Sequence, residues 1–458
     1  IDFRRFHATK LFFPGIFAAY HAYPYYPDFV YLQKSYQNTW NDEGFPDPYY
    51  GYLLDLKEHN QGMPLVIAEY GLPSSRGLSH YSPYGFHQGG HSEAEQAVLS
   101  VEMTQSIVNT GCAGAIYFEW ADEWFKHNWL VMDFELPFEN RKRWHNMENP
   151  EQNFGILALE SRTKTLDGDL SDWENGGEDM ANISMKAHAD AGYFYLSAIL
   201  PGLDLSDADL YIALDTYDEE KGDHRLPFSD ETFHNGFEFL VELKSADSAW
   251  ILVDEPYSVF TDIYNDHIPV YSSKNNANGK FVHQLMLTNR GRTGLLGDVT
   301  DSVIIDRSLL TFGNSSEPES SNADWLYDQS KNTLELRLDW HLLNVSDPSG
   351  RFVLDDKKGT AEIEYSMTDE FNIFLFLVNE ADGSIIQFPR DDPFSFIWDT
   401  WEDPSYSQRL KPVYFSLQDY FRELVPGGNP YSPRAGIEMK FEIADFYDNK
   451  PGAVSLSF

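Results

Sequence analysis

A carboxylate in the segment Met63–Gly71 stands where active sites are often found. Leu65–Ala68 is a short apolar run, typical of a strand buried on both faces of a parallel sheet. Glu69 follows directly, and a charge at the end of such a strand costs free energy unless it is paired or used. Active sites of α/β sheets and barrels lie at this carboxyl edge. Glu69 is therefore a candidate catalytic residue; the alternative is a carboxylate that caps a loop or pairs with an arginine.

Polar and aromatic side chains also follow two other predicted strands. The apolar segment Gly15–Tyr20 runs into His21, Tyr23 and Tyr25, and the segment Ala113–Trp120 predicts a further strand. The end of that strand and the loop after it carry Glu119, Trp120, Asp122, Glu123 and Trp124. The loop after the Glu69 strand carries Arg76. Because these side chains lie in predicted loops, we favour ligand contact over core packing for them.

Predicted helices separate these strands. Asp2–Phe12, Asp47–His59 and Ser92–Asn109 are expected to be helical, the second opening at Pro48 and the third with acidic residues in its first turn. Such alternation predicts βα units around a parallel sheet. A complete eightfold barrel needs about 250 residues. Residues 1–160 are therefore predicted to form a partial α/β, TIM-barrel-like region.

The motifs in this region resemble the ends of strands six, seven and eight of retaining TIM-barrel glycoside hydrolases. They are His21-Ala22-Tyr23, Ile67-Ala68-Glu69-Tyr70-Gly71 and the closing Trp120, in that order and with helices between them. The resemblance implies that Glu69 is the nucleophile and that Tyr23 hydrogen-bonds and orients it. It also implies that His21 lines the catalytic floor and that Trp120 stacks on the sugar.

A sugar ligand agrees with these residue types, because apolar ring faces suit aromatic platforms and hydroxyl groups suit carboxylates. We predict that the substrate-binding residues are Tyr25, Arg76, Glu119, Trp120, Asp122, Glu123 and Trp124. The spacing of His80, His87 and His91 matches no zinc-protease pattern, so we do not expect metal catalysis.

The sequence departs from the glycosidase pattern at the second carboxyl group. Retaining hydrolysis is a double displacement that needs a second carboxyl about 5–5.5 Å from the nucleophile. In this clan that acid ends strand four, usually as Asn-Glu, ahead of the segments present in this sequence. Glu119, Asp122 and Glu123 are the nearest substitutes, although they follow a different strand. We therefore expect the chain alone to be inactive and the upstream half of the barrel to be missing from it.

Residues 161–390 have the pattern of an antiparallel β-sandwich. Strands separated by Gly, Asp or Asn turns, without helices between them, are predicted over Ile183–His188, Tyr193–Leu200, Leu210–Thr216, Gly236–Leu243, Trp250–Val253, Leu334–Leu338 and Phe371–Val378. The opening Asp167-Gly168-x-x-x-Asp172-Trp173 resembles ninth-family carbohydrate-binding modules. In residues 391–458, an aromatic segment, a helix over Pro412–Leu424 and closing strands are expected to pack on the preceding domains.

An acidic loop in this second region is a candidate calcium site. Asp215, Asp218 and Asp223, with Glu219 and Glu220 between them, offer several of the six to eight oxygens that calcium prefers. The alternative is a solvated acidic turn. Candidates for a sugar platform in this region are Trp250, Tyr257, Phe260, Tyr264 and Tyr271, and core packing is equally open for them.

Composition limits the partners. The chain has 458 residues and 73 acidic against 33 basic side chains, a formal net charge of −40, which disfavours nucleic acid and anionic lipid. A single cysteine, Cys112, excludes an intramolecular disulfide. No segment approaches the roughly 20 apolar residues of a membrane-spanning helix. The sequence begins at Ile1, and the missing signal sequence says nothing about secretion. We expect an extracellular or cell-surface location.

The sequence thus predicts a multidomain chain that is part of a retaining glycoside hydrolase acting on a poly- or oligosaccharide. The alternative is a non-catalytic polysaccharide-binding or scaffold protein, in which the barrel face survives only as a glycan cleft.

Overall fold

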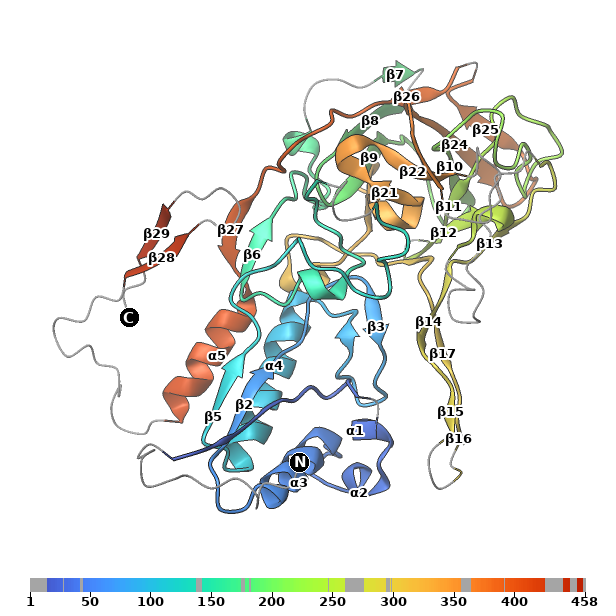
Figure 1. Cartoon of the computed structure of the whole chain (residues 1–458). Coiled ribbons are helices and arrows are strands. Elements are labelled where there is room, and N and C mark those ends of the chain that lie inside the picture. Colours follow the sequence, from blue (N-terminus) through green and yellow to red (C-terminus); the bar gives the residue numbers. More distant parts are fainter. Residues whose placement is uncertain are drawn as a thin grey trace.

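The computed structural model describes residues 15–27, 29–41, 44–136, 142–173, 178–180, 183–245, 247–259, 276–293, 297, 299–355, 364–390, 392–424, 440–444 and 451–455. Figure 1 shows a small unit of helices and parallel strands below a larger body of antiparallel sheets. The helix predicted over Asp2–Phe12 lies outside the described residues.

The small unit is built on a three-stranded parallel sheet. Its strands are β1 (Ala18–His21), β2 (Leu65–Tyr70) and β5 (Gly114–Tyr117), in the order β1-β2-β5. Helix α3 (Pro48–His59) connects β1 to β2, and α4 (Glu93–Asn109) connects β2 to β5. The predicted βα alternation is therefore present.

Local sequence signals explain where the two longer helices begin. Asp47 caps the start of α3, because its carboxylate accepts a hydrogen bond from the Tyr50 N–H. Pro48 is the first helical residue, a position that suits proline. Ser92 and Glu95 form a capping box at the start of α4. Leu53 of α3 and Met103 of α4 then pack with the buried residues of β2 in one hydrophobic cluster.

Short elements complete this unit. They are α1 (Phe29–Leu32), α2 (Lys34–Gln37), the hairpin β3 (Leu78–His80) and β4 (Gln88–Gly89), a 3-10 helix at Pro150–Gln152, and β6 (Leu157–Glu160).

Two antiparallel sheets form the larger body, as expected of a β-sandwich. One has the order β19-β20-β9-β8-β7 and the other contains the path β13-β12-β11-β10-β24-β25, with β18 and β26 at its sides. The strands of the first sheet are β7 (Glu178–Met180), β8 (Ile183–Ala189), β9 (Tyr193–Ile199), β19 (Trp325–Asp328) and β20 (Thr333–Asp339). Those of the second are β10 (Ala208–Asp215), β11 (Phe239–Ser245), β12 (Ser248–Asp254), β13 (Phe281–Val282), β18 (Leu309–Leu310), β24 (Phe371–Asn379), β25 (Ile385–Phe388) and β26 (Phe394–Phe396).

One hydrophobic core joins these two sheets. Phe194 and Leu336 from the first sheet lie in the same buried cluster as Leu214, Val253 and Phe371 from the second. A separate small sheet is formed by β21 (Val345–Asp347), β22 (Phe352–Asp355) and β23 (Glu364–Met367). Further 3-10 helices cover Leu170–Asp172, Glu255–Tyr257, Pro318–Ser320, Trp340–Leu343 and Pro348–Gly350.

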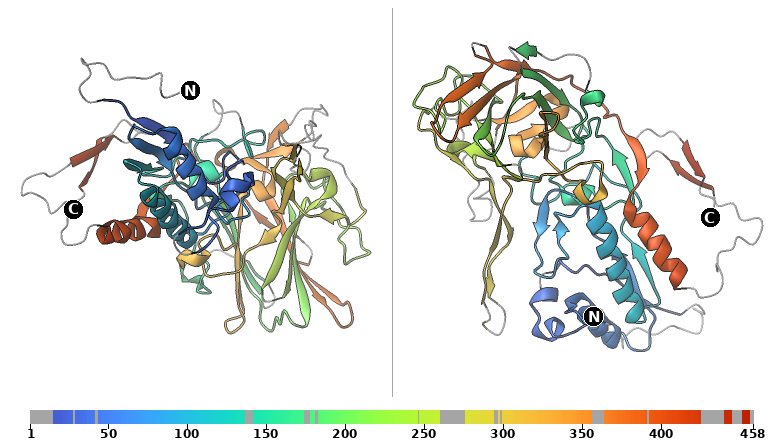
Figure 2. Two further views of the ribbon diagram at one scale, coloured as in Figure 1. Left: turned by 90° about the horizontal axis from the view of Figure 1, so that it is seen from below. Right: turned by 180° about the vertical axis from the view of Figure 1, so that it is seen from behind.

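A two-stranded arm projects from the second sheet. It consists of β14 (Leu285–Asn289) with β17 (Val303–Asp306) and, farther out, β15 (Arg292–Thr293) with β16 (Val299–Thr300). Figures 1 and 2 show the arm running past β3. Where β14 ends, midway along the arm, the Asn289 side chain donates hydrogen bonds to the Tyr31 hydroxyl and the Tyr81 carbonyl and so ties the arm to the small unit.

The chain returns to the small unit after the second sheet. Strand β27 (Ser407–Leu410) pairs antiparallel with β6, and helix α5 (Pro412–Glu423) packs Val413 and Leu417 against Ala97 of α4. Figure 2 shows α4 and α5 side by side from both directions. The two large sheets are therefore inserted between segments of one unit. The last strands, β28 (Lys440–Ala444) and β29 (Pro451–Ser455), pair with each other.

Among the described residues, no helix combines the length and apolar character required to cross a membrane.

Candidate functional site

Glu69 lies near the carboxyl end of β2, beside the end of β1. The strand register pairs it with His21, and the Ala22 N–H donates to the Glu69 carbonyl at 3.0 Å. His21 Nδ1 lies 3.0 Å from Glu69 Oε2, and the Tyr23 hydroxyl donates to the same oxygen at 3.1 Å. Within the described residues, no hydrogen bond is made to the other carboxylate oxygen, Oε1. The structure thus brings the three predicted catalytic residues together.

The Glu69 carboxylate is held but accessible. Its side chain is 30% exposed and that of His21 is 62% exposed. The Tyr23 ring packs on Tyr25 and on the edge of Phe154, with centroids 5.4 and 6.3 Å apart. Burial, followed by the charge of Glu69, raises the pKa of Tyr23, so its hydroxyl stays protonated and remains a donor.

A second carboxyl group, Glu119, follows β5. Burial raises its pKa to about 9 against the opposing charge of Lys126, so Glu119 carries a proton at neutral pH. Lys126 Nζ is 3.4 Å from Glu119 Oε2 and 2.8 Å from Glu123 Oε2, and it lies 4.1 Å from the centre of the Phe118 ring. The Oε1 atom of Glu119 is buried without a hydrogen-bond partner among the described residues.

Gly71 lets the chain that follows β5 approach the end of β2. A Cβ atom on Gly71 would lie 2.2 Å from the Phe118 carbonyl oxygen, so no larger residue fits without a shift of the backbone. The Phe118 N–H donates to the Tyr70 carbonyl at 2.8 Å. The chain leaving β5 is therefore held against the chain leaving β2.

A third carboxyl group, Glu151, was missed by the sequence reasoning. It lies in the 3-10 helix at Pro150–Gln152, and its side chain accepts a hydrogen bond from Gln88. Burial raises its pKa despite the opposing charge of Lys126, and the charge of Glu69 adds to the increase. The only sequence signal, Asn149-Pro150, marks a capped turn and says nothing about function.

Tyr23 is the common neighbour of the three carboxyl groups. The charges of Glu69, Glu151 and Glu119, in decreasing order, all raise its pKa in addition to burial. This group of side chains can bind a hydroxyl-rich or cationic ligand, present a carboxylate nucleophile and supply a proton from Glu119.

Two residues predicted to contact a ligand, Tyr25 and Arg76, are instead buried and bonded within the protein. Tyr25 is 2% exposed, and its hydroxyl donates to the Gly71 carbonyl at 3.4 Å. Arg76 is 10% exposed on its side chain, with its guanidinium bonded to Glu148 and Asp324 at 2.5 and 2.9 Å. Both side chains are buried and engaged, so the interpretation as ligand contacts is corrected to core packing for Tyr25 and ion pairing for Arg76.

Asp122 and Trp124 are corrected in the same way. Asp122 is 2% exposed and forms a 2.8 Å ion pair with Lys411, a residue far away in the sequence. Trp124 is also 2% exposed and stacks on His145, with centroids 4.9 Å apart and rings inclined by 13°. By contrast, Trp120 is 36% exposed and the Glu123 side chain 31% exposed, so both remain open to a ligand.

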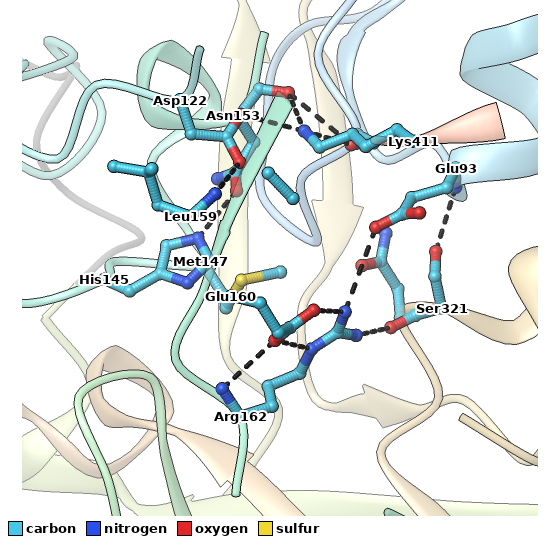
Figure 3. Close-up of a pocket in the computed structure, with 13 residues that line it drawn as sticks. Glu93, Asp122, His145, Met147, Asn153, Leu159, Glu160, Arg162, Ser321 and Lys411 are labelled. Carbon is cyan, nitrogen blue, oxygen red and sulfur yellow. Dashed lines mark hydrogen bonds and ion pairs between the residues drawn. The ribbon is translucent and has the colours of Figure 1, made fainter. Parts of the chain in front are cut away.

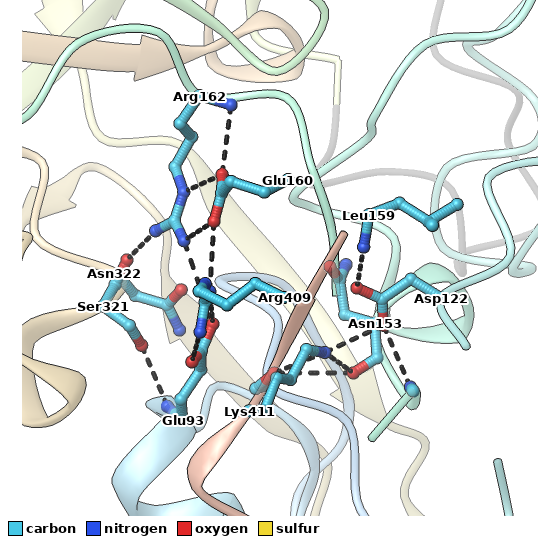
Figure 4. A network of polar contacts seen from close by, with 12 residues as sticks. Glu93, Asp122, Asn153, Leu159, Glu160, Arg162, Ser321, Asn322, Arg409 and Lys411 are labelled. Carbon is cyan, nitrogen blue, oxygen red and sulfur yellow. Dashed lines mark hydrogen bonds and ion pairs between the residues drawn. The ribbon is translucent and has the colours of Figure 1, made fainter. Parts of the chain in front are cut away.

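A small pocket at the junction of the small unit and the sandwich is lined by charged groups that pair with one another. Its volume is about 20 Å³, room for about one water molecule. Arg409 donates to Glu93 and Glu160, Arg162 pairs with Glu160, and Lys411 pairs with Asp122 (Figures 3 and 4). Basic and acidic groups balance, which identifies this network as a structural joint.

The remaining sequence candidates that the structure describes are engaged with other side chains. His87 and His91 stack with centroids 5.3 Å apart, and burial, followed by the charge of His91, lowers the pKa of His87 to about 4. Tyr257 is fully buried, and Trp250 packs on the outer hydrophobic cluster of the second sheet. Phe260, Tyr264 and Tyr271 lie outside the described residues.

The predicted calcium ligands do not form a cluster by themselves. Asp215 accepts hydrogen bonds from Asn235 and Asn372, Asp218 accepts from the Glu220 N–H, and Asp223 accepts from three backbone N–H groups. In the part of the chain that the structure describes, no group of three or more His, Cys, Asp or Glu residues is arranged to hold a metal ion. The calcium site therefore stays a prediction.

Comparison with known proteins gives no relative: the chain matches no protein-family model, no curated protein and no solved structure.

Proposed function

We propose that the Glu69 site is the nucleophile side of a retaining glycoside hydrolase centre that acts on a poly- or oligosaccharide. In this proposal β1, α3, β2, α4 and β5 are the closing βα units of a TIM barrel. The observation that carries it is the pair of contacts from Tyr23 and His21 to one oxygen of a partly exposed glutamate at the carboxyl end of β2. Such contacts hold a carboxylate in one orientation, as a nucleophile requires.

Glu119 is the proton donor that the described residues offer. A retaining hydrolase needs a second carboxyl group that is protonated first and acts as a base later. Burial keeps Glu119 protonated at neutral pH. When Glu119 is ionised, its charge acts on the same Tyr23 hydroxyl as that of Glu69, so the two carboxyl groups share a neighbour. This departs from the family pattern, in which the acid comes from another strand; a carboxyl group on further barrel strands is the rival donor.

The reaction would proceed in two displacements. The Glu69 carboxylate attacks the anomeric carbon while protonated Glu119 gives its proton to the departing glycosidic oxygen, leaving a glycosyl ester on Glu69. Glu119, now a carboxylate, takes a proton from water, and the resulting hydroxide attacks the anomeric carbon. The sugar leaves as a hemiacetal, and both carboxyl groups return to their starting states.

The test is covalent labelling of the protein with a panel of 2-deoxy-2-fluoro glycosides that carry activated leaving groups. We expect peptide mass spectrometry to locate the added sugar on Glu69 and Glu69→Gln to abolish the label. Glu58→Gln, on the exposed side of α3, is the matched control and should be labelled like the parent.

Two other outcomes are informative. Because an activated leaving group needs little protonation, Glu119→Gln should still be labelled but should lose turnover of unactivated glycosides; full turnover would assign the acid to the rival donor. Glycan binding without labelling by any member of the panel would contradict the hydrolase proposal and support the alternative, a polysaccharide-binding protein.

A further inference from the structure

Three buried carboxyl groups lie side by side at one end of the second sheet, far from the Glu69 site in the fold. Strand β10 ends at Asp215, Glu238 precedes β11, and β12 ends at Asp254. The register pairs Leu214 with Phe239 and Phe239 with Val253, which puts the three acidic residues on one face of adjacent strands. Asp215 and Glu238 are each 1% exposed and Asp254 is fully buried.

In Glu238 and in Asp254, hydrogen bonds from described residues reach one carboxyl oxygen and not the other. The Thr216 N–H and hydroxyl donate to Glu238 Oε2 at 2.7 and 3.2 Å, and the Asn276 side-chain amide donates to Asp254 Oδ2 at 2.8 Å. Glu238 Oε1, Asp254 Oδ1 and Asn276 Oδ1 are all buried and have no hydrogen-bond partner among the described residues. Buried oxygens of this kind are rare unless a ligand satisfies them.

A glycine keeps space open beside Glu238. Gly222 has a φ of +73°, and a Cβ atom on it would lie 2.8 Å from Glu238 Oε1. The next residue, Asp223, forms backbone bridges to both Phe237 and Asn276. The loop that follows β10 therefore folds over the free oxygens and brings Asn276 to them.

Several acidic side chains gather here without a basic partner among the described residues. Within the described residues, no Lys, Arg or His forms an ion pair with Asp215, Asp223, Glu238 or Asp254. Burial, then the charge of Asp215, raises the pKa of Glu238 well above its usual range. Burial, then the charge of Asp223, raises the pKa of Asp254 to about 8. A bound cation would offset this repulsion.

We propose that Glu238, Asp254 and Asn276 bind a calcium ion beneath the loop that follows β10. Carboxylate and amide oxygens are the ligands that calcium prefers, and its flexible shell of six to eight oxygens leaves places for water or backbone carbonyls. Asp215 and Asp223 add negative charge around the ion. This assignment replaces Asp218 of the sequence prediction, whose carboxylate lies on the loop and accepts from the Glu220 N–H. It does not depend on the proposed hydrolase activity.

The test measures ion binding and thermal unfolding of the full chain after treatment with a chelator. We expect one calcium ion per chain and a rise in melting temperature of roughly 5 °C when free calcium exceeds its Kd a hundredfold. Terbium, which takes the same oxygen ligands, should bind with tyrosine-sensitised emission that calcium abolishes, because the Tyr257 hydroxyl accepts from the Gly222 N–H beside the site.

Two variants and a matched control locate the site. Glu238→Gln and Asp254→Asn should each weaken calcium binding by at least roughly a hundredfold, because a neutral amide replaces a charged ligand. Asp218→Asn, on the same loop, should bind like the parent. Without calcium, Glu238→Gln should be at least as stable as the parent, since it removes a carboxyl group next to two others.

The results separate the outcomes. A parent chain that binds no calcium or terbium would overturn the proposal. Loss of binding in Asp218→Asn, with Glu238→Gln unaffected, would return the site to the exposed loop. If Glu238→Gln fails to fold, Asp254→Asn and the terbium titration of the parent decide the question by themselves.

Discussion

At the scale of single residues, the contacts on Glu69 are asymmetric: Tyr23 and His21 both approach Oε2, and no described residue bonds Oε1. We therefore expect the loss of the Tyr23 hydroxyl to reduce the reactivity of Glu69 but to have little effect on the stability of the fold.

The first prediction concerns Tyr23→Phe. A hydrogen bond to a charged group contributes about 1.5–3 kcal/mol, so the variant should be labelled at Glu69 roughly 10 to 100 times more slowly. The measurement is the labelling rate with a fluoro-glycoside at saturating concentration. The circular dichroism spectrum should match that of the parent, since the ring still packs on Tyr25 and Phe154. An unchanged labelling rate would show that Tyr23 does not orient the carboxylate.

The second prediction concerns pH and Glu119. Its pKa in the folded chain is raised from 4.5 to about 9, so the folded state binds the proton more tightly than the unfolded state. The contribution of Glu119 to the free energy of unfolding therefore falls as pH rises between these values, with a slope that approaches one proton. Denaturant titrations of the parent and of Glu119→Gln at pH 6 and pH 9 should differ in this slope. Parallel curves would mean that Glu119 is ionised in the folded chain.

Sequence reasoning identified the residues that touch Glu69 and failed where the partner is distant. The resemblance to barrel glycosidases implied that Tyr23 would hydrogen-bond Glu69 and that His21 would line the same site. Asp122 carries the same loop signal as Glu123, but Lys411, on a segment nearly 300 residues later, buries its carboxylate. No pattern around Asp122 could reveal that partner.

At the scale of elements, the helices follow local signals closely. Capped helix starts at Asp47 and Ser92 were readable because their bonds span only three residues. The strands were harder to delimit: β2 extends to Tyr70, so Glu69 lies inside it, and β5 ends at Tyr117, before Glu119. Strand ends depend on pairing with neighbours, which a single segment does not encode.

The third prediction concerns the start of α4. Ser92→Ala removes the side-chain acceptor of the Glu95 N–H and should lower the free energy of unfolding by about 1 kcal/mol. Ser92→Thr should retain most of the stability, because threonine also caps helices. The measurement is chemical denaturation of the three proteins. A loss of the same size in both variants would point to packing at this position instead of the cap.

At the scale of the whole molecule, buried charges join the small unit to the sandwich. Arg76 bonds Asp324 and the carbonyls of Arg307 and Leu309, all in the larger body, and Glu148 in its own unit. The carboxylate of Asp339 lies 3.8 Å from the same guanidinium. These contacts, invisible in the sequence, oppose independent movement of the two parts.

The fourth prediction tests this joint. Arg76→Met should lower the free energy of unfolding by about 3–5 kcal/mol, because it leaves the buried Asp324 carboxylate without its cation, whereas Glu148 keeps its pair with Arg307. Arg225→Met, which breaks an exposed pair with Asp230, is the control and should cost at most about 1 kcal/mol. The measurement is urea unfolding followed by tryptophan fluorescence. Equal effects of the two changes would contradict a coupling role for Arg76.

The pairing of β6 with β27 has a consequence for biosynthesis. Glu160 and Ser407 face each other across these two strands, although the sandwich is translated between them. A ribosome therefore makes the strands of the sandwich before it makes the last strand and helix of the small unit. Since domains fold largely as they emerge, residues 15–160 leave the ribosome long before their closing segment, and the small unit is completed only after the chain beyond Ser407 has emerged.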